Sequence, residues 1–163
     1  MTDKSLQHVK LDSAADYVAA LDTVCALVKH SLMIFEKDFV NIGFDSSLRF
    51  DHLRSFLLDN PNNRLQLLAH DTRPMSQYCP RLMTLLRQFG HSMLIYQTPK
   101  HLQHLTEPFA VADESQFVRR FHFDHTRGIL GINDGGTARL LKSRFAEIWQ
   151  ASHPSVYTST FSL

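Results

Sequence analysis

The sequence has few of the residues that mark several large classes of protein. Cysteine occurs twice in 163 residues, and glycine and proline occur six times each. Two cysteines exclude a disulfide scaffold, and so little glycine and proline beside 44% hydrophobic residues excludes a disordered chain. No apolar run approaches the roughly 20 residues of a membrane span, and the opening MTDKSLQH contains no signal-peptide core. We therefore expect a cytoplasmic protein of bacterial type that does not enter a membrane.

An excess of one charge is also missing. Lys and Arg number 17 against 16 for Asp and Glu, so the formal net charge is +1. A protein that binds nucleic acid by bulk electrostatics carries a clear positive excess. Nucleic acid is therefore a partner that the composition permits but does not favour.

The length suits one domain that buries roughly 70% of its unfolded surface. Cys25 falls within a helical apolar pattern and is interpreted as a small buried residue, and Cys79, before a proline, as an inert loop thiol. We predict one α/β domain over residues 1–154 and a loose tail, rich in Ser and Thr, over residues 155–163.

Helical and strand patterns alternate through the first two-thirds of the chain. Helices are predicted to begin after Ser13, at Ser47 and at Pro80, where residues suited to helix starts precede apolar positions at a 3.6-residue period. Short, largely apolar runs alternate with them and are typical of strands. These runs are residues 9–11, 32–35, 65–68 and 93–96. Because helical crossovers join parallel strands, we predict parallel pairing among them.

The last third has a different pattern. Two apolar runs, residues 109–112 and 116–118, flank the turn-forming residues 113–115 as in a hairpin. A strand at residues 128–132 precedes a final helix, for which Asp134 is the predicted cap. The whole pattern predicts an α/β fold, a three-layer αβα sandwich with a mixed, largely parallel sheet.

Three segments carry a resemblance to a known family. A long first helix leads into the run at 32–35, EPFAVADE stands at 107–114, and GILGI at 128–132 is followed by ARLL and FAEIW in the last helix. Together, over about residues 8–152, they resemble one half of a phospholipase D-like domain. The resemblance implies that fold, and it implies a homodimer, because half-domains of this family pair around their pocket.

The family's catalytic motif, His-x-Lys followed by Asp, is largely absent. Alignment on Asp113 places Thr106 at the position of the nucleophilic His and Pro108 at that of the charge-neutralising Lys. The family's Gly-Ser-x-Asn segment is replaced by residues 118–124, VRRFHFD. The resemblance therefore implies a member without the family's phosphodiesterase chemistry.

Histidine is abundant, with 10 residues, and forms the pairs His101/His104 and His122/His125. Residues i and i+3 of a strand face opposite ways, and neither a nearby Cys nor a His-Glu-x-x-His pattern completes a zinc site. We expect structural or surface histidines, with no metal and no cofactor. No glycine-rich phosphate loop is present either.

Arg120, His122 and Asp124 alternate along a predicted strand and would share one face. Either they form an edge strand whose charges discourage aggregation, or they grip an anion beside the family's phosphate pocket. Residues 36–38, Glu-Lys-Asp, follow a buried strand, where open sheets place ligands, although a charged loop that pairs with itself is the simpler interpretation. The candidate anion-binding residues are Arg81, Thr106, Asp113, Arg120, His122 and Asp124.

The functional hypothesis is a non-catalytic binding or assembly module that holds a phosphate-containing anion, such as a phosphate of a nucleotide or nucleic acid. Two alternatives stay open. One is a phosphodiesterase or nuclease that uses His122 or His104 as its nucleophile. The other is a protein-interaction domain with no small ligand.

Overall fold

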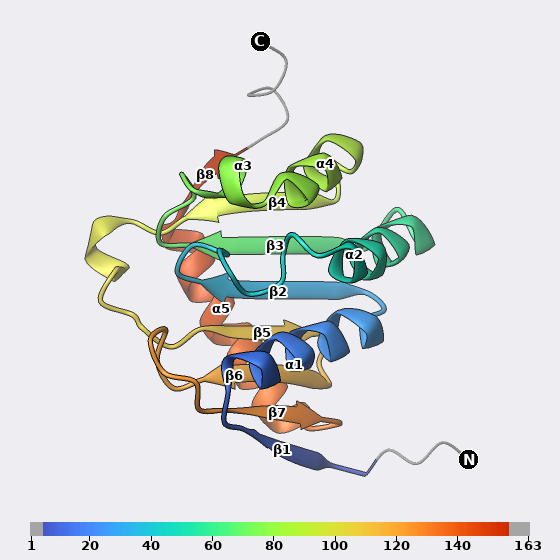
Figure 1. Cartoon of the computed structure of the whole chain (residues 1–163), viewed down its shortest axis with the longest axis vertical. Helices are drawn as coiled ribbons and strands as arrows, with labels where there is room; N and C mark the ends of the chain where they lie inside the picture. The colour runs from blue at the N-terminus through green and yellow to red at the C-terminus, as the bar shows by residue number, and fades with distance from the viewer. Residues whose placement is uncertain (1–4, 157–163) are drawn as a thin grey trace.

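The structure is a computed structural model that describes residues 5–156. Its centre is one eight-stranded sheet in the order β1-β7-β6-β5-β2-β3-β4-β8 (Figure 1). The strands are β1 (Gln7–Leu11), β2 (Ser31–Glu36), β3 (Arg64–Ala69), β4 (Met93–Gln97), β5 (Phe109–Ala112), β6 (Gln116–Arg120), β7 (Gly128–Ile132) and β8 (His153–Val156).

Helices cover both faces of this sheet. One face carries α1 (Ala14–Leu27), α2 (Ser47–Asp59), the short α3 (Met75–Tyr78) and α4 (Pro80–Gln88), while α5 (Gly135–Ala151) lies behind the other face (Figure 1). A 3₁₀ turn, η1 (Lys100–Leu102), follows β4. Each face has its own apolar core, one built with α1, α2 and α4 and the other with α5. The predicted three-layer α/β sandwich with a mixed sheet is confirmed.

The predicted largely parallel pairing is wrong. Only β2–β3 and β3–β4 are parallel among the described strands, and the other five pairings are antiparallel. The two crossovers through α2 and through α3 and α4 behave as expected. However, β1 does not pair with β2: it lies at the edge of the sheet against β7, because the β5–β6 hairpin and β7 occupy the intervening places.

Local signals placed the helix starts well. The hydroxyl of Ser13 accepts the N–H of Asp16 at 3.0 Å, and the carboxylate of Asp134 accepts the N–H of Thr137 at 3.1 Å. Such caps satisfy amide groups that a helix start leaves unpaired. At the other end of α5 the chain does not loosen at residue 155, since Ser155 lies within β8 beside β4. The remainder of the predicted tail, residues 157–163, lies outside the described residues.

The loop between β2 and α2 is held by a buried arginine. Arg49 is fully buried; its guanidinium donates to Asp22 Oδ1 at 2.5 Å and to the carbonyls of Ile42 and Val18 at 3.0 and 3.1 Å. Gly43, at φ +89°, sits so close that a Cβ there would lie 2.6 Å from this guanidinium. Burial of a charge requires this kind of full pairing. The contacts attach the loop to α1 and so fix one wall of the site described below.

Candidate anion-binding site

The carboxyl ends of β2, β3, β4 and β6 meet at one edge of the sheet, which we call the carboxyl edge (left in Figure 1). Because β5 runs antiparallel to β2, residues that precede β5 lie at the same edge. Backbone bonds fasten the turn after β6 there: the N–H of Phe123 donates to the carbonyl of Thr106 at 2.8 Å. Segments around residues 36, 70, 106 and 122 are therefore gathered in one place.

Four of the six predicted site residues lie at the carboxyl edge: Thr106, Arg120, His122 and Asp124. The predicted strand that would carry Arg120, His122 and Asp124 is wrong after its first residue, since β6 ends at Arg120 and a turn follows. In this turn the N–H of Asp124 donates to His122 Nδ1 at 3.0 Å. Arg120 and His122 consequently face neighbouring cavities instead of sharing one strand face.

Asp113 lies at the opposite end of β5. Seven residues of largely extended chain separate it from Thr106, which at about 3.3 Å per residue amounts to roughly 20 Å. Its carboxylate accepts the backbone N–H groups of Lys29, His30 and Ser31 at 3.1, 2.8 and 3.1 Å. With a φ of +58°, Asp113 turns the chain between β5 and β6. Asp113 therefore lies outside the predicted cluster. It joins the turn between β5 and β6 to the chain that enters β2.

Arg81 is also apart from the cluster. It lies in the first turn of α4, where its backbone N–H donates to Asp45 Oδ1 at 3.2 Å and its guanidinium donates to the Asp45 carbonyl at 2.7 Å. Neither of the two cavities described next is lined by Arg81. α4 begins beyond the loop and α3 that follow β3.

Two cavities open at the carboxyl edge. The first, of about 320 Å³, we call the His122 cavity; its lining residues are Lys37, His70, Asp71, Gln103, Thr106, His122, Phe123 and Asp124. The second, of about 280 Å³, we call the Arg120 cavity; its lining residues are Ala14, Tyr17, Glu36, Lys37, Asp38, Val40, Asn41, Ile42, Arg120 and Phe123. Lys37 and Phe123 line both, so the two cavities are neighbours.

A buried polar triad forms the inner wall of the Arg120 cavity. The hydroxyl of Tyr17 donates a short hydrogen bond to Glu36 Oε2, and Arg120 Nη2 donates to Glu36 Oε1 at 3.4 Å. The guanidinium also stacks 4.2 Å above the ring of Tyr17. The side chain of Glu36 is 3% exposed, and that of Arg120 is 12% exposed. Of the charged segment at residues 36–38, Glu36 therefore pairs with Arg120 on β6, and it does not pair within its own loop.

Burial dominates the ionisation of this triad. It raises the pKa of Glu36 from 4.5 to about 7, although the Tyr17 hydroxyl and the Arg120 charge both act to lower it. Burial and the carboxylate of Glu36 also raise the pKa of Tyr17 well above its usual value. At neutral pH the tyrosine is thus protonated, while Glu36 is near its midpoint.

The two histidines of the His122 cavity differ in how many of their ring nitrogens are hydrogen-bonded. His70 Nε2 donates to the Leu105 carbonyl at 2.6 Å and its Nδ1 bonds the Thr98 hydroxyl at 2.5 Å, so both nitrogens are occupied. Burial lowers the pKa of His70 and keeps this ring neutral. His122 accepts a backbone N–H at Nδ1, so its neutral form carries the proton on Nε2. Neither ring presents an unprotonated nitrogen to the cavity in this arrangement.

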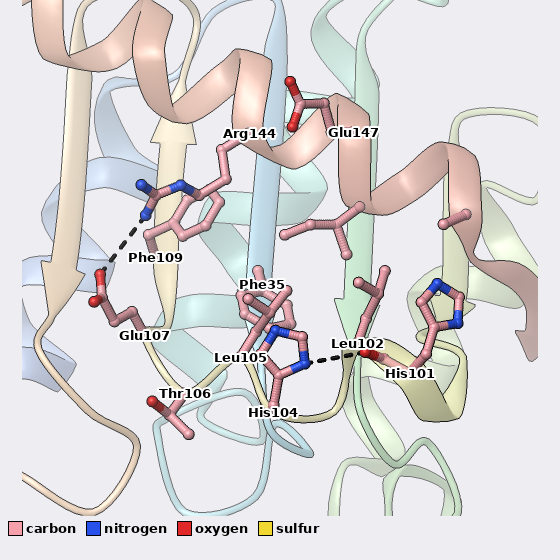
Figure 2. Close-up of a pocket in the computed structure, with 12 residues that line it drawn as sticks. Phe35, His101, Leu102, His104, Leu105, Thr106, Glu107, Phe109, Arg144 and Glu147 are labelled. Carbon is pink, nitrogen blue, oxygen red and sulfur yellow. Dashed lines mark hydrogen bonds and ion pairs between the residues drawn. The ribbon is translucent and has the colours of Figure 1, made fainter.

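A third and larger cavity, of about 630 Å³, lies between α5 and the segment that contains η1 (Figure 2). Its floor is apolar and includes the rings of Phe35 and Phe109. At its rim Glu107 is held between Arg119, at 3.1 Å, and Arg144, at 3.6 Å. Thr106 lines both this cavity and the His122 cavity. Sequence reasoning missed it because its walls come from segments whose apposition no local pattern reveals.

Within residues 5–156, no three His, Cys, Asp or Glu side chains are grouped so that they could hold a metal ion. The rings of His122 and His125 lie with centroids 5.0 Å apart, without a third ligand. None of the helices in this range is long and apolar enough to cross a bilayer.

Solved structures with this fold include a protein described as DNA-binding and one described as a phospholipase D family member. One is the archaeal chromatin protein TrmBL2, which is described as showing a novel mode of DNA binding. It superposes with a TM-score of 0.65 at 12% identity over 92% of this chain, and this chain spans about half (54%) of TrmBL2. The phospholipase D family member Nuc from Salmonella typhimurium gives 0.64 at 11% identity, with 93% and 97% of the two chains covered. NucT from Helicobacter pylori gives 0.63 at 9% identity, with 93% and 100% covered.

At such identities the superpositions show the fold, and they confirm that it is phospholipase D-like. No curated protein sequence matches the chain significantly. A family of sequences is nevertheless defined that spans almost all of it, over residues 13–159. The chain belongs to this family, which is described as a domain of unknown function, DUF7931.

Proposed function

We propose that the protein is a non-catalytic binding module that holds a phosphate-containing anion at the carboxyl edge. The observation that carries the proposal is the convergence of two cations, Arg120 and Lys37, on adjoining cavities. The Lys37 ammonium has no ion-pair partner among the described residues, and Arg120 has only long hydrogen bonds. Cationic groups with unused donors in a concave site are suited to phosphate oxygens.

Neighbouring groups extend the donor set. The hydroxyl of Thr106 and the Nε2–H of His122 line the His122 cavity beside Lys37. A phosphate group in the His122 cavity would thus meet donors from three separate segments of the chain.

In the His122 and Arg120 cavities the described residues present no free nucleophile, and this supports the non-catalytic part of the proposal. The resemblance to phospholipase D-like domains places Thr106 and Pro108 at the positions of the catalytic His and Lys, and no described base contacts the Thr106 hydroxyl to activate it. His70 and His122 are engaged as described above. His104 donates from Nδ1 to the His101 carbonyl, which leaves its Nε2 free, but its ring lines the larger cavity (Figure 2) and neither the His122 nor the Arg120 cavity.

The fold supports the choice of ligand. Proteins of this fold are described as a phospholipase D family member and as a DNA-binding chromatin protein, so phosphate groups are common to their ligands. Resemblance to that family also favours a homodimer, in which a second copy would border the carboxyl edge.

The test is the binding of inorganic phosphate, measured by calorimetry and by the shift in thermal unfolding. Lys37 and Lys29 are a matched pair, since one follows β2 at the carboxyl edge and the other precedes β2 at the opposite end. We expect the wild type and Lys29→Ala to bind equally and Lys37→Ala to bind about tenfold more weakly, a loss of about 1.4 kcal/mol.

Two results would contradict the proposal. Equal binding by the two lysine variants, or no phosphate binding by the wild type, would remove the anion site and favour a domain that contacts proteins alone. Hydrolysis of bis(p-nitrophenyl) phosphate that disappears in His122→Ala or in His104→Ala would make the protein a phosphodiesterase. Sedimentation of the purified chain tests the dimer separately.

A further inference from the structure

Arg120 is incompletely bonded for a buried guanidinium. Its two hydrogen bonds, from Nη2 to Glu36 Oε1 and from Nη1 to the His125 carbonyl, are long at 3.4 and 3.5 Å. Its Nε is buried and has no hydrogen-bond partner among residues 5–156. Most buried donors are paired at distances near 2.9 Å. Arg120 therefore has bonding capacity that the folded chain leaves unused, next to a cavity of about 280 Å³.

The charges that line the Arg120 cavity balance only when Glu36 is ionised. Lys37 and Arg120 contribute two positive charges, and Glu36 and Asp38 contribute two negative ones. Loss of the Glu36 charge leaves the cavity with one net positive charge and frees Arg120 from its carboxylate partner. An anion would then find an uncompensated cation where it previously met a neutral pair.

We propose that an anion binds at Arg120 together with one proton, which Glu36 takes up at Oε1. The proposal rests on the proposed function, because it assigns the regulation of the Arg120 cavity within the anion site at the carboxyl edge. The proton comes from solvent and converts the carboxylate to a neutral carboxylic acid, with no other bond made or broken. Tyr17 continues to donate to Oε2, so the acid stays fixed while Arg120 Nη2 turns from Oε1 to the ligand.

The groups around Glu36 favour this residue as the proton acceptor. Tyr17 approaches from α1, Arg120 from β6, and Lys37 and Asp38 from the loop after β2, while His125 contributes its backbone carbonyl to Arg120. Burial already raises the pKa of Glu36 to about 7, and Asp38 acts in the same direction. A bound anion raises it further, because it adds a negative charge and withdraws Arg120.

Linkage then sets the sign of the pH dependence. A ligand that binds only the protonated form of Glu36 binds best below the pKa of that group, and its affinity falls by about tenfold for each pH unit above it. The carboxylate competes with the anion for Arg120 at high pH, and protonation removes the competitor at low pH. The site would consequently release its ligand as the pH rises.

The experiment uses inorganic sulfate, which keeps its charge between pH 5 and 9 whereas phosphate titrates in that range. Calorimetry in two buffers of different ionisation enthalpy counts the protons taken up. For the wild type we expect uptake approaching one proton at pH 8 and about a tenfold loss of affinity between pH 7.5 and 8.5. For Glu36→Gln, which keeps an acceptor for Tyr17 but cannot ionise, we expect no linked proton and tighter binding than the wild type at pH 8.5.

A second variant guards against a failure of Glu36→Gln to fold. Tyr17→Phe retains the ring beneath Arg120 but removes a hydrogen bond that stabilises the Glu36 carboxylate, so the fall in sulfate affinity should begin at a higher pH. Circular dichroism checks the fold of both variants.

The outcomes separate this inference from the proposed function. Sulfate binding by the wild type without proton uptake would overturn the inference and leave the anion site intact. Proton uptake that persists in Glu36→Gln would also overturn it, because another group would then take up the proton. No sulfate binding by the wild type or by Glu36→Gln at any pH would overturn both.

Discussion

The ionisation of Glu36 should make the stability of the free protein depend on pH in a way that one substitution removes. Burial raises the pKa of this carboxyl from 4.5 to about 7 in the folded chain, and its side chain is 3% exposed, so solvent screens it little. At about 1.4 kcal/mol per pKa unit, the difference corresponds to about 3 kcal/mol in the free energy of unfolding.

The sign follows from which state holds the proton more tightly. The folded protein retains the proton of Glu36 at pH values where the unfolded chain has released it. The stabilisation that protonated Glu36 provides is therefore fully present below about pH 4.5 and is lost as the pH rises to about 7 and beyond. Above that range the folded chain has a buried carboxylate whose desolvation the long Arg120 contact only partly offsets.

The assay is urea unfolding of the wild type and Glu36→Gln at half-unit steps from pH 4 to 8.5. All other titrating groups are common to both proteins, so the difference in unfolding free energy isolates Glu36. We expect the variant to gain about 3 kcal/mol relative to the wild type between pH 4.5 and 8. Glu147→Gln is the matched control, because Glu147 is exposed and its difference from the wild type should stay within about 0.5 kcal/mol. Parallel curves for the wild type and Glu36→Gln would refute the reasoning.

Three further predictions concern residues that line neither the His122 cavity nor the Arg120 cavity. Arg49→Ala should lower the unfolding free energy by about 3–5 kcal/mol, because it removes a fully buried guanidinium that pairs with the partly buried Asp22. Arg54→Ala on the exposed side of the same helix should change it by less than about 0.5 kcal/mol in urea titrations. Asp113→Ala should lower the unfolding free energy by about 2–3 kcal/mol, since three backbone N–H groups lose their acceptor, but it should leave phosphate affinity unchanged. A parallel loss of affinity would show that Asp113 belongs to the anion site. Cys25 and Cys79 are buried, and burial raises their pKa to about 12 and about 11, so mass spectrometry should find both unmodified by iodoacetamide at pH 8 until denaturant is added. Rapid modification of the folded protein would show that the core opens.

Local patterns in the sequence were sufficient for the elements themselves. Ser13 and Asp134 cap helices where predicted, and the apolar runs at 32–35, 65–68 and 93–96 became β2, β3 and β4. Caps and periodicity act over a few residues, so their effect is readable without knowledge of the rest of the chain. The two parallel pairings followed equally well, because a helical crossover constrains the strands that it joins.

The tertiary structure alone decided which residues meet. The pattern of a strand shows which of its faces are buried but not which strand lies beside it. The position of the β5–β6 hairpin beside β2 was therefore not predicted, and because of it most strand pairings are antiparallel. The same placement carried Asp113 to the far end of the sheet and brought Tyr17, Glu36 and Arg120 into contact across 19 and 84 residues of sequence. Helix starts and buried runs are properties of short segments, whereas the balance of charge at the carboxyl edge arises only when distant segments share one desolvated space.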